Sequence, residues 1–455
     1  MNLLHLNNES EHPIFTGADI RRLIWPLLLE QVLVMLVGLA DTVMVSQVGE
    51  AAVSGVSLVD MMNQLIFSIL SALATGGAVI TAQYIGKKRR DKACETANQL
   101  LYAALLIGLV IMGLCIGLRG PMLRLFFGSI EPQVMEAALI YLVVSAVSYP
   151  FLAMYNAGAA LFRSMGKSRV TLWVSLFMNG VNLVFNGVFI FGFQLGALGA
   201  GLGSLIARAA AALLINGLLI GPGHEIRYVK PARPWIRTAE LKRILYIGIP
   251  SGLEGGVFQL GRILVVSIIA TFGTTQIAAN AVANNFDGIG VIPGNALMLA
   301  MITVVGQCVG AGEYQQAEYY TKRLMVIAIA AFLVWDSLIL LTLPWTIQVY
   351  NLSADTLALA RLLVTIHNSC AIVLWPFSFV LPNALRAAND VKYPMAVSMF
   401  SMMVFRVLFS VILGQYFGMG AVGVWIAMLL DWVFRGTFFV LRFHGRKWQR
   451  MKLAE

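Results

Sequence analysis

The chain has 455 residues, of which 59% are hydrophobic and 12% are charged, and its formal net charge is +10. Soluble globular proteins carry about 45–50% apolar and about 25% charged residues, so this composition excludes a soluble multidomain enzyme and a disordered chain. A positive charge can indicate a nucleic-acid partner, and its placement along the chain decides whether it does.

Twelve long apolar segments follow one another along the chain, and each reaches the ~20 helical residues that cross a hydrocarbon core. The predicted spans are 22–47, 52–83, 97–118, 136–160, 169–193, 196–220, 244–272, 277–308, 324–345, 357–384, 394–416 and 420–441. In lipid, a helix satisfies all its backbone groups within the segment. The sequence therefore predicts an all-α polytopic membrane protein.

Lysine and arginine residues gather on one side of the predicted membrane. Of the 32, 25 fall in the loops and tails on the side of the N-terminus, and three fall on the opposite side. The remaining four lie inside predicted spans: Arg208, Arg262, Arg406 and Arg435. By the positive-inside rule, both termini are cytoplasmic in a multi-pass plasma (inner) membrane protein. The charge indicates topology, and we expect no nucleic-acid partner.

The second half of the chain repeats the first at an offset of 224 residues. The matching pairs are Pro26 and Pro250, Glu30 and Glu254, Gly49 and Gly273, Gln83 and Gln307, Gly86 and Gly310, and Gly196 and Gly420. We predict two pseudo-symmetric six-helix lobes, residues 1–220 and 244–441, joined by a cytoplasmic linker at 221–243 and followed by a basic tail at 442–455. Repeats of six spans share one orientation, and such folds bind substrate between the lobes.

Ionisable side chains within the membrane are functional candidates, because burying them there is costly. Asp41 lies inside the first predicted span, and its repeat mate is Val265. Because the acid is present in only one lobe, we favour a cation or proton site at Asp41. The alternative is a structural carboxylate whose hydrogen bonds come from a neighbouring helix. Glu30 and Glu254 occupy equivalent positions in the two repeats. That symmetry favours a structural role, such as capping a helix start, with gating of the inner face as the functional alternative.

Polar side chains at helical spacing mark the second and eighth spans. Such stripes face a cavity or a neighbouring helix rather than lipid, and both readings stay open here. The stripe of the second span includes Asp60 and Gln64, and that of the eighth consists of Asn280, Asn284 and Asp287. His367 in the tenth span is a further cavity candidate, although a lone histidine is more often a satisfied buried side chain.

Asn182 and Asn186 lie one helical turn apart in the fifth span, and Ser204 follows in the sixth. Amide oxygens suit a small cation or a protonated carboxyl group. Enzyme motifs are absent from the sequence: it has no phosphate-binding glycine loop followed by Lys-Ser/Thr and no histidine-rich metal cluster. We therefore predict a protein that is not an enzyme, has no cofactor, and takes its energy from an ion gradient if it transports.

Several motifs together resemble those of the multidrug and toxic compound extrusion (MATE) transporters across nearly the whole chain. They are Gly38-Leu-Ala-Asp41-Thr-Val-Met, Asn182 with Asn186, Gly196-Ala-Leu-Gly199, Gln83 to Gly86 with Gln307 to Gly310, and the loops Arg163-Ser-Met-Gly166 and Arg386-Ala-Ala-Asn389. The resemblance implies a secondary active multidrug efflux transporter. It would export organic cations and amphipathic compounds in antiport with Na⁺ or H⁺ by alternating access, and we expect it to act as a monomer.

In one branch of that family, the ion site uses positions that correspond here to Asp41, Asn182, Asn186 and Ser204. Asn186 stands where that branch has an aspartate, so one carboxylate is missing. Another branch uses acids on the seventh and tenth spans, but the usual position on the seventh is Phe258. The resemblance therefore implies an ion site centred on Asp41. The alternative function is a lipid-linked precursor flippase of the same superfamily, for which Arg208, Arg262 and Arg406 would form a cationic cavity.

Overall fold

The computed structural model describes residues 13–128, 131–221, 223–228 and 237–451, and within them the chain is nearly all helical, with no β-strand. The α-helices are α1 (Gly17–Ser46), α2 (Glu50–Gly86), α3 (Arg90–Gly117), α4 (Arg119–Phe127), α5 (Pro132–Ser164), α6 (Ser168–Gly187), α7 (Gly196–Leu218), α8 (Thr238–Ala270), α9 (Thr274–Gly290), α10 (Ile292–Gly310), α11 (Tyr314–Thr346), α12 (Ala354–Trp375), α13 (Leu381–Ala387), α14 (Lys392–Ser401) and α15 (Gly420–His444). Twelve helical stretches of the described chain are long and apolar enough to cross a membrane, which confirms the predicted fold class.

Four π-helical segments interrupt or extend these helices: η1 (Val188–Gly192), η3 (Pro376–Val380), η4 (Met402–Leu408) and η5 (Val411–Tyr416). Two 3₁₀ segments are η2 (Ile347–Tyr350) and η6 (Lys447–Arg450). Some π-helical segments connect two α-helices into one continuous membrane span. For example, α12, η3 and α13 together form the span Ala354–Ala387. Such π-turns often occur at functional sites, and η4 carries Arg406.

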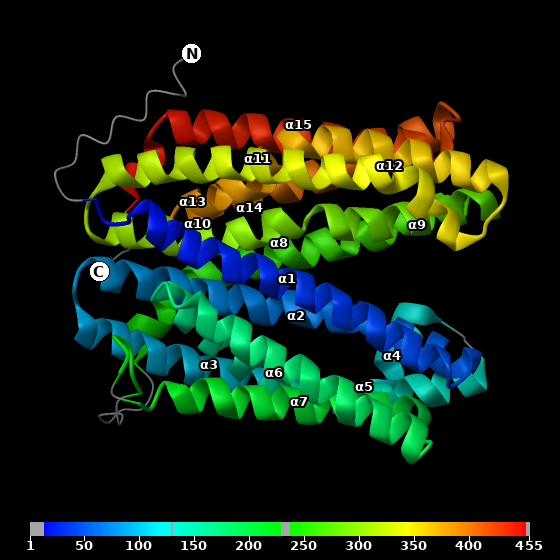
Figure 1. The fold of residues 1–455 in the computed structure, drawn as a ribbon, viewed down its shortest axis with the longest axis horizontal. Helices are drawn as coiled ribbons and strands as arrows, with labels where there is room; N and C mark the ends of the chain where they lie inside the picture. Colours follow the sequence, from blue (N-terminus) through cyan, green and yellow to red (C-terminus); the bar gives the residue numbers. More distant parts are fainter. Residues whose placement is uncertain (1–12, 129–130, 222, 229–236, 452–455) are drawn as a thin grey trace. The chain divides into compact units, whose positions relative to one another are not determined.

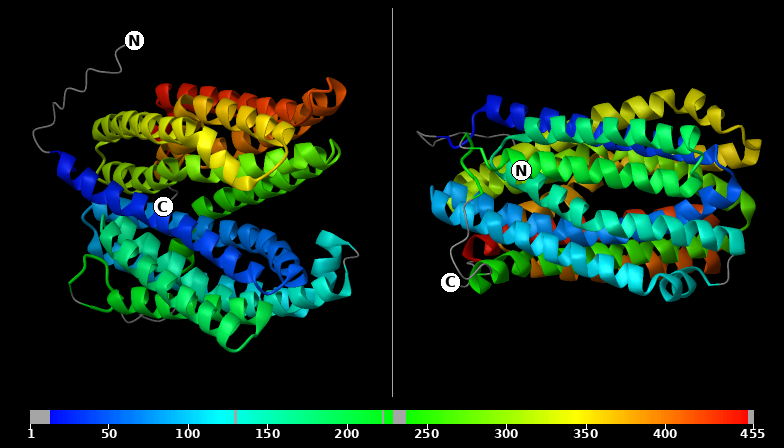
Figure 2. Two further views of the ribbon diagram at one scale, coloured as in Figure 1. Left: turned by 45° about the vertical axis from the view of Figure 1, so that its right-hand side comes forward. Right: turned by 90° about the horizontal axis from the view of Figure 1, so that it is seen from below.

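The described chain divides into two compact units. The first, here called the N-unit, runs from Asp19 to Gly252. The second, the C-unit, contains residues 13–18 and 253–451. Within the N-unit, α5 packs against α2, α3 and α7, and within the C-unit α12 packs against α9, α11 and α15. Figures 1 and 2 show the helices of each unit lying side by side along much of their length.

The repeat seen in the sequence reappears in the backbone. Gly49 and its mate Gly273 both have positive φ, at 131° and 96°, directly before α2 and α9. Gly196 and Gly420 have φ values of 57° and 59° at the first residues of α7 and α15. Glycine adopts these angles without the steric cost that a Cβ atom brings. The glycine anchors are therefore equivalent turns in the two halves of the chain.

Two elements differ from the sequence prediction. The predicted span 277–308 is split at Val291 into α9 and α10, although the equivalent α2 is continuous. Pro293 lies in the first turn of α10, where its missing N–H is tolerated. The short helix α4 was not predicted. Parts of the predicted linker, at 222 and 229–236, and of the predicted tail, at 452–455, lie outside the described residues.

Candidate functional site

Three helices of the N-unit bring the predicted ion-site residues together. Asp41 comes from α1, and Asn186 Nδ2 on α6 donates a hydrogen bond to its Oδ1 atom at 2.9 Å. Asn182 lies one turn before Asn186, and its amide is assigned with the nitrogen toward Asp41 because both polar atoms then have partners. In that orientation the nitrogen lies 2.8 and 3.2 Å from the two Asp41 oxygens, and the amide oxygen accepts from Ser204 Oγ at 3.2 Å. The four side chains form one cluster.

A close approach of α6 and α7 holds this cluster together. Gly203 faces Asn186 so closely that an added Cβ atom would overlap the Asn186 side-chain oxygen and lie 2.9 Å from its backbone nitrogen. Both asparagines are buried. The small residues that the sequence places in α7 are therefore needed to seat the amide beside the carboxylate.

A cavity of about 470 Å³ in the N-unit opens beside Asp41. This volume is in the range of small-molecule sites, about 300–1,000 Å³. Its polar lining includes Asp41, Asp60, Gln64, Asn186, Ser204 and Arg208. The structure thus joins the predicted substrate residues of α2 to the predicted ion site in one cavity.

Asp60 in this cavity accepts hydrogen bonds from Asn63 Nδ2 at 2.9 Å and from the Tyr141 hydroxyl at 3.2 Å. Arg208, also in the cavity wall, donates to Ser148 Oγ at 2.6 Å. Sequence reasoning listed Arg208 as an intramembrane charge without assigning it to this site. The sequence did contain a signal for this placement, because an arginine inside a membrane span usually faces protein or a water-filled space.

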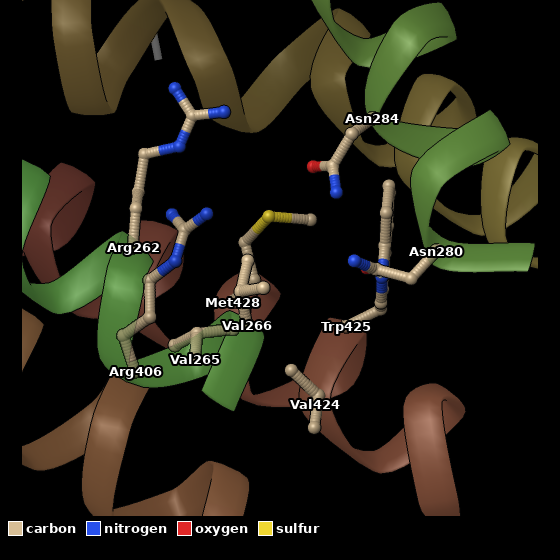
Figure 3. A pocket seen from close by; sticks show the side chains of 9 residues that line it. All are labelled: Arg262, Val265, Val266, Asn280, Asn284, Arg406, Val424, Trp425 and Met428. Carbon is tan, nitrogen blue, oxygen red and sulfur yellow. The ribbon is translucent and has the colours of Figure 1, made fainter. Parts of the chain in front are cut away.

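The candidates of the C-unit separate into two groups. Asn280 and Asn284 line a small pocket of about 50 Å³ together with Arg262, Arg406 and Trp425 (Figure 3). Asn280 Oδ1 accepts a hydrogen bond from Trp425 Nε1 at 2.9 Å. Asp287 and His367 do not line this pocket.

Asp287 and His367 belong instead to a polar chain in which His367 is buried and Asp287 is partly exposed. His367 Nε2 lies 2.9 Å from Asp287 Oδ1, and His367 Nδ1 lies 3.0 Å from Asn368 Oδ1. Asn368 Nδ2 donates to Asp336 Oδ1 at 3.1 Å. The His367 ring also packs edge-on against Trp425 and Trp432. Sequence reasoning missed Asp336, although it is the only acid within the predicted span 324–345.

Glu30 and Glu254 form equivalent ion pairs in their own units. Arg163 Nη1 lies 3.5 Å from Glu30 Oε1, and Arg386 Nη2 lies 2.6 Å from Glu254 Oε2. Glu254 has a second partner in Arg435, at 3.6 Å. Both glutamates thus tie an early helix to the end of a later one. This geometry is compatible with the structural role considered for them, and a gating role stays a prediction.

No group of three or more His, Cys, Asp or Glu residues within the described ranges is placed to hold a metal ion. The Asp41 cluster offers a carboxylate, which is a ligand suited to a small hard cation, and both asparagine amides turn their nitrogens toward it. Twelve helical stretches of the described chain, each long and apolar enough to cross a membrane, define the class as a polytopic membrane protein.

The chain belongs to the MatE family, whose model matches residues 26–188 and again 250–412. Both ends of the second match lie 224 residues after those of the first, which confirms the internal repeat. The protein is similar to the uncharacterized transporter YisQ of Bacillus subtilis, at 26% identity over 95% of each chain. It is also similar to the probable multidrug resistance protein NorM of Thermotoga maritima, at 24% identity over 95% of this chain and 93% of that protein.

Solved structures show the same fold. An outward-facing multidrug resistance MATE family transporter of the MOP superfamily superposes with a TM-score of 0.87. The two chains are 21% identical, and the match covers 95% of this chain and 96% of the other. A MOP superfamily transporter from Pyrococcus furiosus, described as having a binding pocket of reverse polarity, has the same TM-score.

Proposed function

We propose that this protein exports organic cations and other amphipathic compounds across the plasma membrane in antiport with Na⁺ or H⁺. The observation that carries the proposal is Asp41, whose carboxylate lies in the wall of a drug-sized cavity and is held by two asparagine amides. Relatives named as probable multidrug resistance proteins support the substrate class.

Asp41 is suited to reversible cation binding. Its environment offers only amide and hydroxyl partners at short range, so the carboxylate can take up a proton or Na⁺ without displacing a fixed counter-ion. Asn186 Oδ1 is buried and has no hydrogen-bond partner among the described residues. This oxygen faces Gly203, and the amide nitrogen faces Asp41, so a cation at Asp41 would be bound by this oxygen only if the amide turned.

The charges in the cavity wall favour a cationic substrate. Asp41 and Asp60 contribute two negative charges and Arg208 one positive charge, so the lining has a net negative charge when both acids are ionised. Neutralising Asp41 with a proton or Na⁺ removes that excess. Substrate and coupling ion therefore compete for the same charge, and exchange of one for the other follows by linkage.

The orientation proposed for the transporter follows from its basic loops. Most lysines and arginines lie on one side of the predicted membrane, so we place both termini in the cytoplasm. We propose that a single chain is the working unit and that it alternates between inward- and outward-facing access.

The test is efflux of a cationic dye from vesicles containing the purified protein, under a Na⁺ gradient alone and then a pH gradient alone. Wild-type protein should respond to at least one gradient, and Asp41→Asn should lose that response. The control is Asp91→Asn, which changes an exposed acid whose only described ion pair is with Arg89. Gradient-driven efflux by Asp41→Asn at the wild-type rate would refute the assigned site.

A further inference from the structure

The small pocket of the C-unit has a positively charged wall. Arg262 on α8 and Arg406 on η4 line one side of it, and Asn280 and Asn284 on α9 line the other (Figure 3). Trp425 completes the side near the asparagines. None of the residues that line this pocket is acidic.

The partner of Arg406 is located away from the pocket lining. Arg406 Nη1 lies 3.6 Å from Asp431 Oδ2, and Asp431 is fully buried. Ser401 Oγ donates to the other Asp431 oxygen at 2.5 Å. Asp431 therefore offsets the burial of Arg406 while the arginine still contributes to the pocket wall.

Arg262 has no comparable partner. It forms no ion pair with any carboxylate in the part of the chain that the structure describes. Asp287 interacts electrostatically with Arg262 and Arg406, but its short contact is with His367, at 2.9 Å. Arg262 is an exposed residue, so its guanidinium is not covered by other side chains of the unit. Arg262 thus has donors available for a ligand.

We infer that this pocket binds an oxyanion, such as a carboxylate carried by a transported amphipathic compound. Two guanidinium groups supply charge-assisted hydrogen bonds in the fork geometry that suits an oxyanion, and the amide of Asn284 adds a donor. The volume of about 50 Å³ fits one such group and is far too small for a whole drug. Trp425 and Met428 offer apolar contact to the part of the molecule next to the anion.

This inference rests on the proposed transport function, and it widens the substrate class from cations to zwitterions and organic acids. The C-unit pocket would bind the anionic group of such a compound. The oxyanion can also belong to the head group of an anionic lipid, so the test must distinguish a dissolved ligand from the membrane itself.

The test compares two rhodamine dyes that differ only in one group, a free carboxylate in the first and its ethyl ester in the second. Binding to purified protein in nanodiscs of zwitterionic lipid is followed by fluorescence polarisation. Arg262→Gln should weaken binding of the free acid about tenfold or more, as expected for the loss of hydrogen bonds to a charge. The affinity for the ester should stay within about twofold of the wild-type value. Arg262→Lys should recover part of the loss, because it keeps the charge without the fork.

Arg361→Gln is the matched control, because it removes an exposed arginine of the same unit that does not line the pocket. Adding anionic lipid to the nanodiscs identifies the ligand's source. If anionic lipid weakens binding of the acid dye to wild-type protein but not to Arg262→Gln, lipid head groups occupy the pocket. If binding is unchanged, the natural ligand of the pocket is a dissolved anion.

Equal effects of Arg262→Gln on both dyes, or no effect on either, would overturn the inference. The measurement needs no gradient, so failure of the efflux assay leaves it interpretable. Conversely, gradient-driven export of cations by Arg262→Gln at the wild-type rate would leave the proposed function intact whatever the binding result.

Discussion

The Asp41 carboxylate accepts a hydrogen bond from Asn186 Nδ2 at 2.9 Å, although 145 residues separate the two positions in the sequence. The contact joins α1 to α6 within the N-unit, in the wall of the cavity of about 470 Å³. A neutral amide at this place leaves Asp41 as the one acid of the cluster. This pairing fixes how strongly the site can attract a cation.

Asn186→Asp should strengthen cation binding by the Asp41 cluster. Two carboxylates about 3 Å apart cannot both be ionised without a cation between them, so a proton or Na⁺ is held more tightly. We expect the ion concentration that gives half-maximal efflux to fall about tenfold or more. The charge-swapped double variant Asp41→Asn with Asn186→Asp tests the geometry, since it should regain ion-dependent efflux that Asp41→Asn lacks. A double variant as inactive as Asp41→Asn would contradict the shared site.

Gly203→Ala should damage the ion site through packing alone. The new methyl group would meet the side chain and backbone of Asn186 and push its amide away from Asp41. Overpacking of this kind costs about 1–3 kcal/mol, and we expect a large loss of gradient-driven efflux with the protein still inserted. The control is Gly217→Ala on the same helix, where an added Cβ atom has no neighbour within 4 Å. Equal efflux by the two variants would rule out the packing argument.

Removing the charge of Glu254 should destabilise the protein more than removing that of Glu30. Glu254→Gln removes the carboxylate partner of two guanidiniums, Arg386 and Arg435, whose side chains are 11% and 3% exposed. Breaking a buried ion pair from one side costs about 3–5 kcal/mol. Glu30→Gln affects one longer contact, at 3.5 Å to Arg163, and leaves the Thr171 hydroxyl as a possible donor to the new amide. Thermal denaturation of the purified variants measures the order, and a lower melting temperature for Glu30→Gln would contradict it.

The segment 223–228 should loosen as the pH falls. Partial burial and the positive charge of Lys167, whose Nζ atom lies 2.7 Å from Nδ1, lower the pKa of His224 below its usual 6.5. Since the unfolded segment binds the proton more readily than the folded one, the stabilising contribution is present above pH 6.5 and is lost at lower pH.

Hydrogen–deuterium exchange of residues 223–228 at pH 7.5 and about 5.5, corrected for the intrinsic exchange rate, measures this loosening. Protection should fall at the lower pH in wild-type protein. His224→Gln removes the titrating group and should show the same protection at both values. A pH effect of equal size in that variant would assign it to another group.

Properties that depend on local pattern could be predicted from the amino-acid sequence. Helical spans follow from runs of apolar residues, because each helix satisfies its own backbone in lipid. The repeat followed from anchors such as Gly49 and Gly273, whose identity is set by the backbone angle at one position. Asp41, Asn182 and Asn186 stood out in the sequence as an acid and two amides within apolar spans, and the family resemblance grouped them with Ser204 as a predicted ion site.

Which of these groups contact one another depends on the packing of the helices and could not be predicted from the sequence. Arg262 and Arg406 are 144 positions apart and yet line one pocket, and Asp336 reaches His367 only through Asn368. The partners of Glu30 and Glu254 lie 133 and 132 residues away. Such pairings depend on how helices rotate and pack against one another, and that is set by the summed shapes of many side chains. The pattern along one helix shows that a polar group needs a partner, whereas packing determines which group becomes that partner.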